Sequence, residues 1–167
     1  MRNKNGFTLV EMLAVIVILG VVMAIAVVSV NSYIEKSKKD TYVSTAHEYM
    51  TIASNMIAQQ KIVIRDPKTV YYIHVANLDT EKKLSKSPYG KWIDAYVVVT
   101  VDSKTNDVTF YWTSVDEKGF RVDLVKEADL DIKDVHHSDN LTIDTNQIIG
   151  EREKIVIYGK DGKKTTK

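Results

Sequence analysis

The chain lacks cysteine altogether, and it has few of the residues that interrupt regular structure. Among its 167 residues there are two prolines and seven glycines. Without cysteine there can be no disulfide, no thiolate nucleophile and no thiolate-ligated metal site. The length allows one ordinary domain, so we expect that domain to be stabilised by its own hydrophobic core.

An excess of one charge is missing as well, because 23 Lys and Arg stand against 22 Asp and Glu. Nucleic-acid-binding and polybasic membrane-surface proteins carry a clear positive excess, so the charge balance predicts neither kind of partner. The chain also has no glycine-rich phosphate loop, no G-x-S-x-G sequence and no H-E-x-x-H pair. We therefore expect a protein that is not an enzyme and that holds no cofactor.

Charge is almost absent from one segment. Between residues 7 and 30 the single ionisable side chain is Glu11, and residues 12–28 are all apolar apart from Gly20. A helix of about 24 residues rises roughly 36 Å, which is enough to cross the hydrocarbon core of a bilayer. The segment therefore predicts a transmembrane helix.

The short segment before it, residues 1–6, is polar and contains Arg2 and Lys4, which is typical of a cytoplasmic leader. Three lysines follow the apolar segment: Lys36, Lys38 and Lys39. Because they match the leader's positive charge, the positive-inside rule leaves the orientation open.

Helical periodicity continues beyond the apolar segment. Apolar side chains recur every three or four positions, which predicts an amphipathic helix. They are Tyr42, Val43, Ala46, Tyr49, Met50, Ala53, Met56 and Ile57. No proline or glycine interrupts residues 21–65, so we expect one helix over about 7–60, with its second half packed on a soluble domain. Asp66 and Pro67 either end this helix or mark the loop beyond it.

The rest of the chain predicts β-structure. Residues 70–75 are rich in aromatic and β-branched residues, and residues 95–101 alternate between two faces. Turn signals divide residues 94–124 into a three-stranded antiparallel meander, and residues 154–158 are expected to form a further strand. A long helix followed by such strands predicts an α+β fold in which the helix covers one face of a small antiparallel sheet.

Smaller features complete this prediction. Residues 87–90, Ser-Pro-Tyr-Gly, predict a type I turn, and the structure of the acidic residues 126–147 stays open. Six aromatic residues in or beside the strands favour core packing over a binding face. They are Tyr71, Tyr72, Trp92, Tyr96, Tyr111 and Trp112.

A compact motif precedes the apolar segment. Residues 4–11 read Lys-Asn-Gly-Phe-Thr-Leu-Val-Glu. The basic leader, the glycine before an aromatic residue and the single acid at a fixed place resemble the class III signal of type IV prepilins and type II secretion pseudopilins. The resemblance covers about the first 30 residues, and beyond them the expected helix and sheet are pilin-like in architecture.

The resemblance implies that a prepilin peptidase cuts between Gly6 and Phe7 and methylates the new amine of Phe7. Gly6 has no Cβ, so it can lie extended and close to a protease backbone. Glu11 follows Phe7 by one helical turn, and an ionisable residue within such an apolar segment suggests a function. Its expected partner in subunit assembly is the Phe7 amine of a neighbouring subunit.

The expected division is therefore a leader at 1–6, a transmembrane and filament-core helix at 7–30, and a soluble pilin head at 31–167. The resemblance implies a structural subunit of a type IV pilus, a homo-oligomeric helical filament for adhesion, surface motility or DNA uptake. Before assembly the subunit would span the inner (cytoplasmic) membrane, and afterwards it would be extracellular. Its partners would be the prepilin peptidase, the membrane, and the inner-membrane assembly platform with its ATPase, whereas no nucleic-acid partner is expected.

Two further features of many pilins are missing. Many pilins carry a helix-loosening proline near the position of Val28 and a pair of cysteines near the C-terminus, and this chain has neither. Local melting of the helix and a disulfide-bounded loop are therefore not predicted.

Alternative functions stay open. One is a pseudopilin of a type II secretion or competence system, and another is a binding or sensor domain on a single-pass anchor, with a ligand pocket in its sheet. An ordinary secretory signal peptide would use the A-x-A-like site at residues 24–26, but it leaves Glu11 unexplained. A plain anchor predicts neither Gly6 before Phe7 nor Glu11.

Acidic and histidine side chains near residue 135 raise the possibility of a calcium site, although a solvated acidic loop is the simpler interpretation. They are Asp129, Asp131, Asp134, His136, His137 and Asp139. Their spacing does not match an EF-hand, so no metal site is predicted. The lysines of residues 160–167 are explained by a solvated terminus, although a basic tip could also contact an anionic surface or DNA.

Overall fold

The computed structural model describes residues 8–78, 85–150 and 152–167, without the side chains of residues 28 and 29. The chain divides into two compact units, Met1–Ser37 and Lys38–Lys167. The unit Lys38–Lys167 is called the head below. The expected division after residue 30 stays a prediction.

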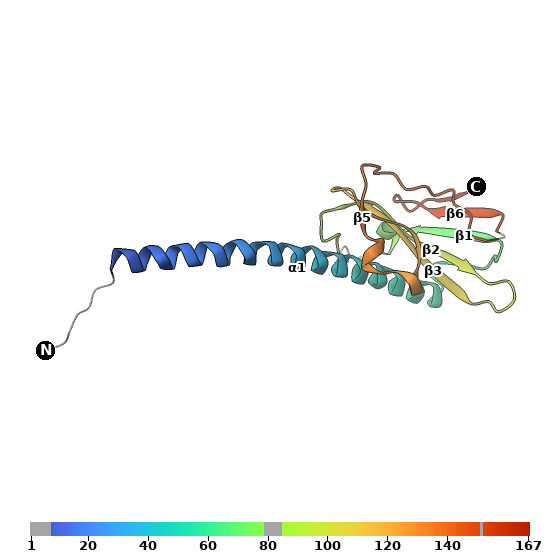
Figure 1. The fold of residues 1–167 in the computed structure, drawn as a ribbon. Helices are drawn as coiled ribbons and strands as arrows, with labels where there is room; N and C mark the ends of the chain where they lie inside the picture. Colours follow the sequence, from blue (N-terminus) through green and yellow to red (C-terminus); the bar gives the residue numbers. More distant parts are fainter. Residues whose placement is uncertain (1–7, 79–84, 151) are drawn as a thin grey trace. The chain divides into compact units, whose positions relative to one another are not determined.

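Helix α1 (Leu9–Ala58) is the long helix that the periodicity predicts, and it contributes to both units (Figure 1). In the first unit its apolar side chains are exposed all around the helix, and an 18-residue window there has a mean hydropathy of 3.1 with none of it buried. By length and composition this part can cross a membrane. The expected start at residue 7 lies outside the described residues.

Within the head, α1 has one buried face. Its buried apolar side chains recur at the predicted spacing and are Tyr42, Ala46, Tyr49, Met50 and Ala53. Val43, Met56 and Ile57 are half-buried against the same core. The amphipathic prediction is confirmed, because the apolar face covers a sheet and the opposite face is exposed.

The C-terminus of α1 is fixed by its own backbone. The N–H of Gln60 donates to the Ile57 carbonyl and the N–H of Lys61 to the Met56 carbonyl, each at 2.9 Å, while Gln60 has a φ of 57°. These are the two bonds and the left-handed residue of a Schellman motif. The helix therefore ends at Ala58, and Asp66 lies in the loop beyond it.

The head contains one seven-stranded sheet with the order β5-β4-β3-β2-β1-β6-β7. Its strands are β1 (Thr69–His74), β2 (Trp92–Val101), β3 (Val108–Asp116), β4 (Phe120–Lys126), β5 (His136–His137), β6 (Lys154–Tyr158) and β7 (Lys164–Thr166). Short 3-10 helices are η1 (Val75–Asn77), η2 (Glu127–Asp129) and η3 (Ile132–Asp134). Strands β2, β3 and β4 form the predicted meander, and β6 is the strand predicted at residues 154–158.

One pairing departs from the expected antiparallel arrangement. Strand β6 pairs with β1 in parallel, with Val70 opposite Ile155, while the other pairings are antiparallel. Parallel strands are joined by a crossover connection, and here the chain after β5, at one edge of the sheet, crosses to β6 beside β1. Residues 138–150 lie in this crossing, and the sheet is mostly antiparallel with one parallel pair.

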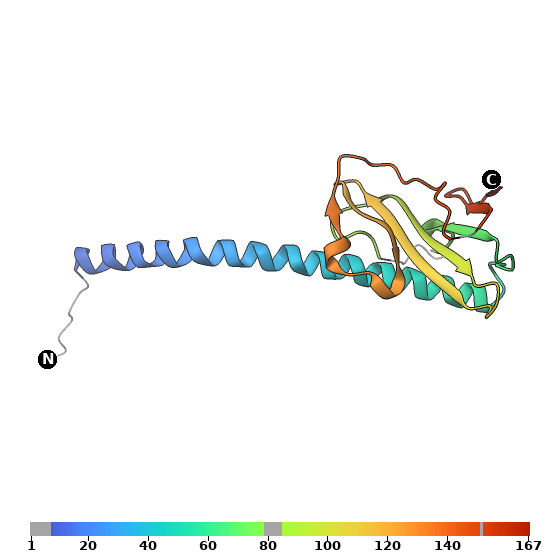
Figure 2. The same cartoon turned by 45° about the vertical axis from the view of Figure 1, so that its right-hand side comes forward.

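The sheet buries both of its faces. On the face under α1, the apolar side chains belong to one core cluster that includes Val97, Val99 and Trp112, and the Trp112 ring stacks on Tyr49 with centroids 5.7 Å apart. The opposite face carries a second cluster around Tyr72 and Val98. Figures 1 and 2 show the second half of α1 lying along the first of these faces.

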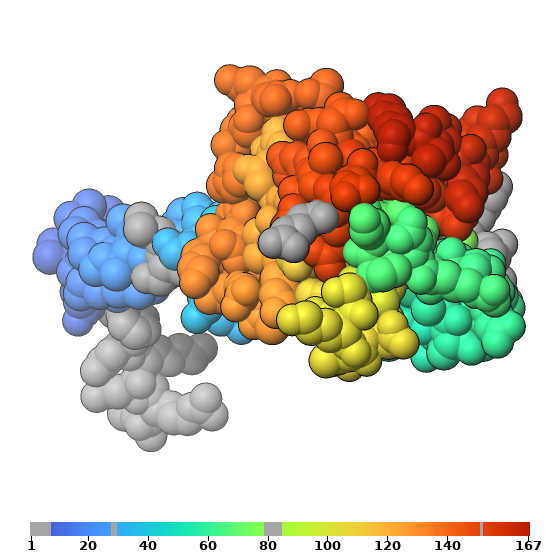
Figure 3. Space-filling view, turned by 90° about the vertical axis from the view of Figure 1, so that its right-hand side faces the viewer, coloured from blue at the N-terminus to red at the C-terminus, as the bar shows by residue number. Residues whose placement is uncertain are grey.

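The crossing segment covers the second face. Ile143 and Ile149 pack against the cluster there, and the Tyr72 hydroxyl donates to the Gln147 carbonyl at 3.0 Å. In Figure 3 the chain after β4, coloured orange to red, makes up much of the visible surface of the head. Burial and the nearby Asp144 carboxylate raise the pKa of Tyr72 to about 12.

The predicted turn at residues 87–90 is present, with the Gly90 N–H donating to the Ser87 carbonyl at 3.1 Å. The Ser87 hydroxyl donates to Oδ2 of Asp116, which is fully buried at the end of β3. Oδ1 of Asp116 accepts from the N–H groups of Lys118 and Phe120. The buried carboxylate therefore ties the turn to the β3–β4 connection.

Candidate processing and assembly site

The first turn of α1 is closed by a reciprocal pair of side chains. The Thr8 hydroxyl lies 3.3 Å from the Glu11 N–H and accepts its hydrogen bond. Oε2 of Glu11 in turn accepts from the Thr8 N–H at 2.7 Å and from the Thr8 hydroxyl at 2.8 Å. This is a capping box, with Thr8 as N-cap and Glu11 three residues later.

The capping box gives Glu11 a role that the sequence reasoning missed. The signal was present as T-x-x-E directly before an apolar run. The box satisfies backbone donors that a helix start otherwise leaves without partners, and it places a carboxylate at the positive end of the helix dipole. Glu11 is therefore held on the first turn in a defined conformation.

Apolar side chains surround this carboxylate along the helix. Leu9, Val10, Met12 and Leu13 are all exposed, with Leu9 at 83%. A helix that is apolar all round is normally buried in a membrane or a larger assembly. The first turn of α1 thus combines the oriented Glu11 carboxylate with an apolar helix surface that is stable only in an apolar environment.

Of the predicted site residues, the structure therefore places one. Glu11 lies on the first turn of α1, while Gly6 and Phe7 lie outside the described residues. The proposed cleavage, methylation and charge pairing stay predictions at this point.

Comparison with known families bears on these residues directly. Residues 1–27 match the family model of the prokaryotic N-terminal methylation motif. This motif is the class III prepilin signal of type IV pilins and pseudopilins, so the resemblance seen in residues 4–11 is confirmed. No solved structure matches the chain.

The prepilin signal and the fold agree. The matched residues contain the apolar first part of α1, and the second part packs on the mostly antiparallel sheet in the pilin-like α+β arrangement that the sequence predicts. The signal supports a type IV pilin or a pseudopilin without deciding which system the subunit serves.

Three of the residues considered for calcium are engaged in local structure. Oδ2 of Asp134 accepts from the Asp131 N–H, and Oδ1 of Asp131 accepts from the Ile132 N–H, which caps η3. Nε2 of His136 lies 3.4 Å from a carboxylate oxygen of Asp123. Within residues 8–78, 85–150 and 152–167, no three His, Asp or Glu side chains form a group that can hold a metal ion.

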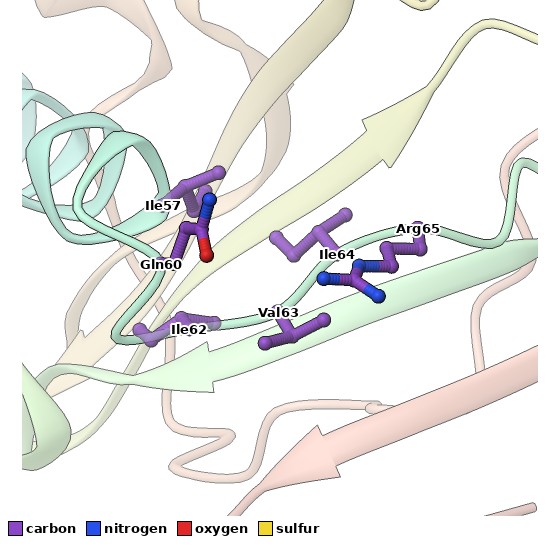
Figure 4. Close-up of a pocket in the computed structure, with 6 residues that line it drawn as sticks. All are labelled: Ile57, Gln60, Ile62, Val63, Ile64 and Arg65. Atoms are coloured by element: carbon purple, nitrogen blue, oxygen red, sulfur yellow. The ribbon is translucent and has the colours of Figure 1, made fainter.

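A sensor domain would need a ligand pocket, and Figure 4 shows one of several pockets, which lies where α1 leads into β1. It has a volume of about 120 Å³, below the several hundred cubic ångströms that ligand sites usually have. Its lining residues are Ile57, Gln60, Ile62, Val63, Ile64 and Arg65. This lining offers one charged group and no convergent set of polar side chains, so this pocket does not favour the sensor alternative. Larger pockets, of about 290 Å³ beside Arg152 and about 320 Å³ beside His137, lie elsewhere on the head.

Proposed function

We propose that the chain is a structural, non-enzymatic subunit of a type IV pilus. The observation that carries the proposal is the prepilin signal on a helix that is apolar on all sides. The precursor would be held in the inner membrane by the first part of α1 and would become part of an extracellular filament for adhesion, surface motility or DNA uptake. In both states that helix would be surrounded by apolar groups, so transfer from lipid to filament needs little free energy.

Processing would begin at Gly6 and Phe7, which the matched motif contains. A prepilin peptidase would cut between them and methylate the new amine of Phe7, which stays cationic. Thr8 then becomes the second residue of the mature chain and keeps its place as N-cap of α1, so the cut removes the leader without removing the cap.

Assembly would use Glu11. A carboxylate among apolar helices is costly unless a cation meets it, and the Phe7 amine of a neighbouring subunit supplies that cation. Both hydrogen bonds from Thr8 end on the same oxygen, Oε2, so the carboxylate is oriented before a neighbour arrives. Only one stagger of adjacent helices brings this group to the neighbour's amine, which would set the axial register.

The decisive experiment is intact-mass measurement and N-terminal sequencing of the subunit from membranes and from sheared surface filaments. The expected mature chain starts at methylated Phe7 in both samples. A Gly6→Val variant should stay uncut, since the β-branched side chain obstructs the extended approach of the peptidase, while the matched Asn5→Ala variant should be cut normally. A mature chain that starts at Val27 would show ordinary secretion and contradict the proposal.

The same preparations separate the pilus from a pseudopilus. Abundant surface filaments in which this chain is the main component support the proposed function. Membrane-bound mature subunit without surface filaments, together with loss of protein secretion when the chain is deleted, would assign it to a pseudopilus instead.

A further inference from the structure

The two edges of the head's sheet carry opposite charge. Strand β5 is the last strand at one edge and β7 the last at the other. Residues 126–139, which lead through η2 and η3 to β5 and just beyond it, contain five acidic residues against two lysines. Residues 152–167, which form the β6–β7 hairpin, contain six basic residues against two acidic ones. These ranges are called the acidic edge and the basic edge below.

The acidic edge is attached to the sheet. The helix η2 contacts β3, η3 contacts β4, and β5 pairs with β4, so all three elements are attached to one side of the sheet. Asp129, Asp131 and Asp139 are exposed. The capping box of η3 holds Asp131 in place, so part of this charge is ordered before any partner binds.

The basic edge is a short hairpin with exposed lysines. The exposed ammonium groups belong to Lys154, Lys160, Lys163, Lys164 and Lys167. The hairpin turn is closed by the Gly159 N–H donating to the Lys163 carbonyl at 2.9 Å. Lys164 lies over the Tyr158 ring and Lys167 donates to the Asn146 side chain, so two of the lysines are oriented by their neighbours.

A single kind of partner accounts for both edges. A polyanion would explain the lysines but not the acids on the far side of the sheet, and a cation would explain the acids alone. A second copy of this chain offers an acidic edge to the basic edge and the reverse. Since the net charge of the chain is +1, copies do not repel one another strongly as they approach.

We propose that the acidic edge of one head binds the basic edge of the next copy of the chain. Such a contact is heterologous, because different surfaces meet, and it continues along a row of copies unless a rotation closes it. The inference rests on the proposed filament, which supplies the neighbours. Exposed ion pairs are individually weak and are screened by salt, so the contact forms where a filament or membrane holds the copies at high local concentration.

Cross-linking tests this directly, because the natural chain has no cysteine. Ala128→Cys places a thiol in η2 on the acidic edge, and Thr165→Cys places one in β7 on the basic edge; both positions are exposed. Full-length chain with both substitutions, treated in cells with a short bis-maleimide, should give a ladder of multimers. Chains with one substitution each, expressed together, should give dimers and no ladder. Dimers from either single variant expressed alone would show a self-complementary contact and overturn the proposal.

Reversing the charges at the two edges is the second test of the contact. Reversing the basic edge with Lys160→Glu and Lys164→Glu should lower the cross-linked fraction by about fivefold or more, and so should reversing the acidic edge with Asp129→Lys and Asp139→Lys. When one chain carries both reversals, attraction is restored and the yield should return to within about twofold of the unreversed chain. Lys104→Glu, on the β2–β3 connection, is the matched control and should change nothing.

The outcomes separate this inference from the proposed function. If filaments form but the reversals leave cross-linking unchanged, the edge contact is wrong and the pilus proposal stands. If the unmodified chain forms no filaments, the pilus proposal fails, and the response of membrane cross-linking to the same reversals decides the edge contact by itself. Failure of the double reversal to restore the yield also overturns the contact.

Discussion

The two parts of helix α1 belong to one continuous element but meet different surroundings. Met23 in the first part is 64% exposed, whereas Met50 in the second part is 1% exposed beneath the sheet. The first part is apolar on every side, and the second part is apolar on one face only. An apolar face that the chain covers with its own sheet stabilises the fold, while one that it leaves uncovered needs lipid or other subunits.

Because of this difference, we expect substitutions in the two parts of α1 to have different effects. Changes in the first part should alter insertion, processing or assembly while the stability of the head stays the same. Changes in the second part should alter the stability of the head. The predictions below test this division and the local interactions that stabilise the head.

The largest effect is expected at Glu11. Glu11→Leu should still be inserted and cut after Gly6, yet lower the filament yield by at least about tenfold, since a neighbour's amine loses its counter-charge. Glu11→Asp should be intermediate because its side chain is shorter. The measurement pairs leader cleavage on an immunoblot with the yield of sheared filaments from the same cells.

Glu11→Gln separates charge pairing from helix capping. Gln suits the third position of a capping box, so the bonds with Thr8 can persist while the charge is lost. If charge pairing drives assembly, this variant should fail like Glu11→Leu. Normal filaments from Glu11→Gln would show that capping is the essential role, and loss of cleavage in either variant would mean that the peptidase reads Glu11.

Removal of the first part of the helix should be tolerated by the head. A fragment of residues 31–167 is expected to be soluble and monomeric at micromolar concentration without detergent, because it contains both core clusters and omits most of the exposed apolar segment. Size-exclusion chromatography with light scattering and circular dichroism measure this. An unfolded fragment, or one that stays oligomeric at high salt, would contradict the division of the chain.

The methionine pair gives a matched comparison within α1. Met50→Ala should lower the free energy of unfolding of the head by about 2–5 kcal/mol, because it leaves a cavity in the core. Met23→Ala removes the same atoms from an exposed position and should leave the melting temperature unchanged. Thermal unfolding of both full-length variants in detergent tests this prediction. An equal fall in melting temperature for the two variants would contradict it.

A smaller effect on the stability of the head is expected when the pH is lowered. Backbone N–H groups of Lys68 and of Thr105 hold the pKa values of Asp66 and Asp102 below their usual value of 3.8. Folded-state pKa values below the unfolded ones stabilise the fold above about pH 4, and that contribution is lost as the pH falls through the folded-state values. Asp66→Asn and Asp102→Asn together should therefore flatten the fall of melting temperature below pH 4. An unaltered acid profile would rule these two groups out as a cause.

The smallest effect concerns the end of α1. Gln60 adopts a left-handed conformation that costs a residue with a Cβ more than it costs glycine. Gln60→Gly should therefore stabilise the head by about 0.5–1 kcal/mol, or roughly 1–4 °C in melting temperature. The matched Gln59→Gly variant, one residue earlier, should not stabilise it.

Much of this molecule could be predicted from local patterns. The apolar segment, the spacing from Tyr42 to Ile57 and the alternation in residues 95–101 each depend on neighbours in the chain, and each predicted element is present. The motif at residues 4–11 was sufficient to identify the prepilin signal that the family model matches. The T-x-x-E capping box could have been read from the same residues.

Other features were decided by tertiary structure, because they depend on residues far apart in sequence. The acidic residues 126–147 had only a weak period, yet Ile143 within them and Ile149 just beyond them pack against the second face of the sheet. That crossing places β6 parallel to β1, which no local pattern in either strand indicates. It also puts the acidic and basic residues at opposite edges of one sheet, whereas the sequence by itself shows only that they follow one another along the chain.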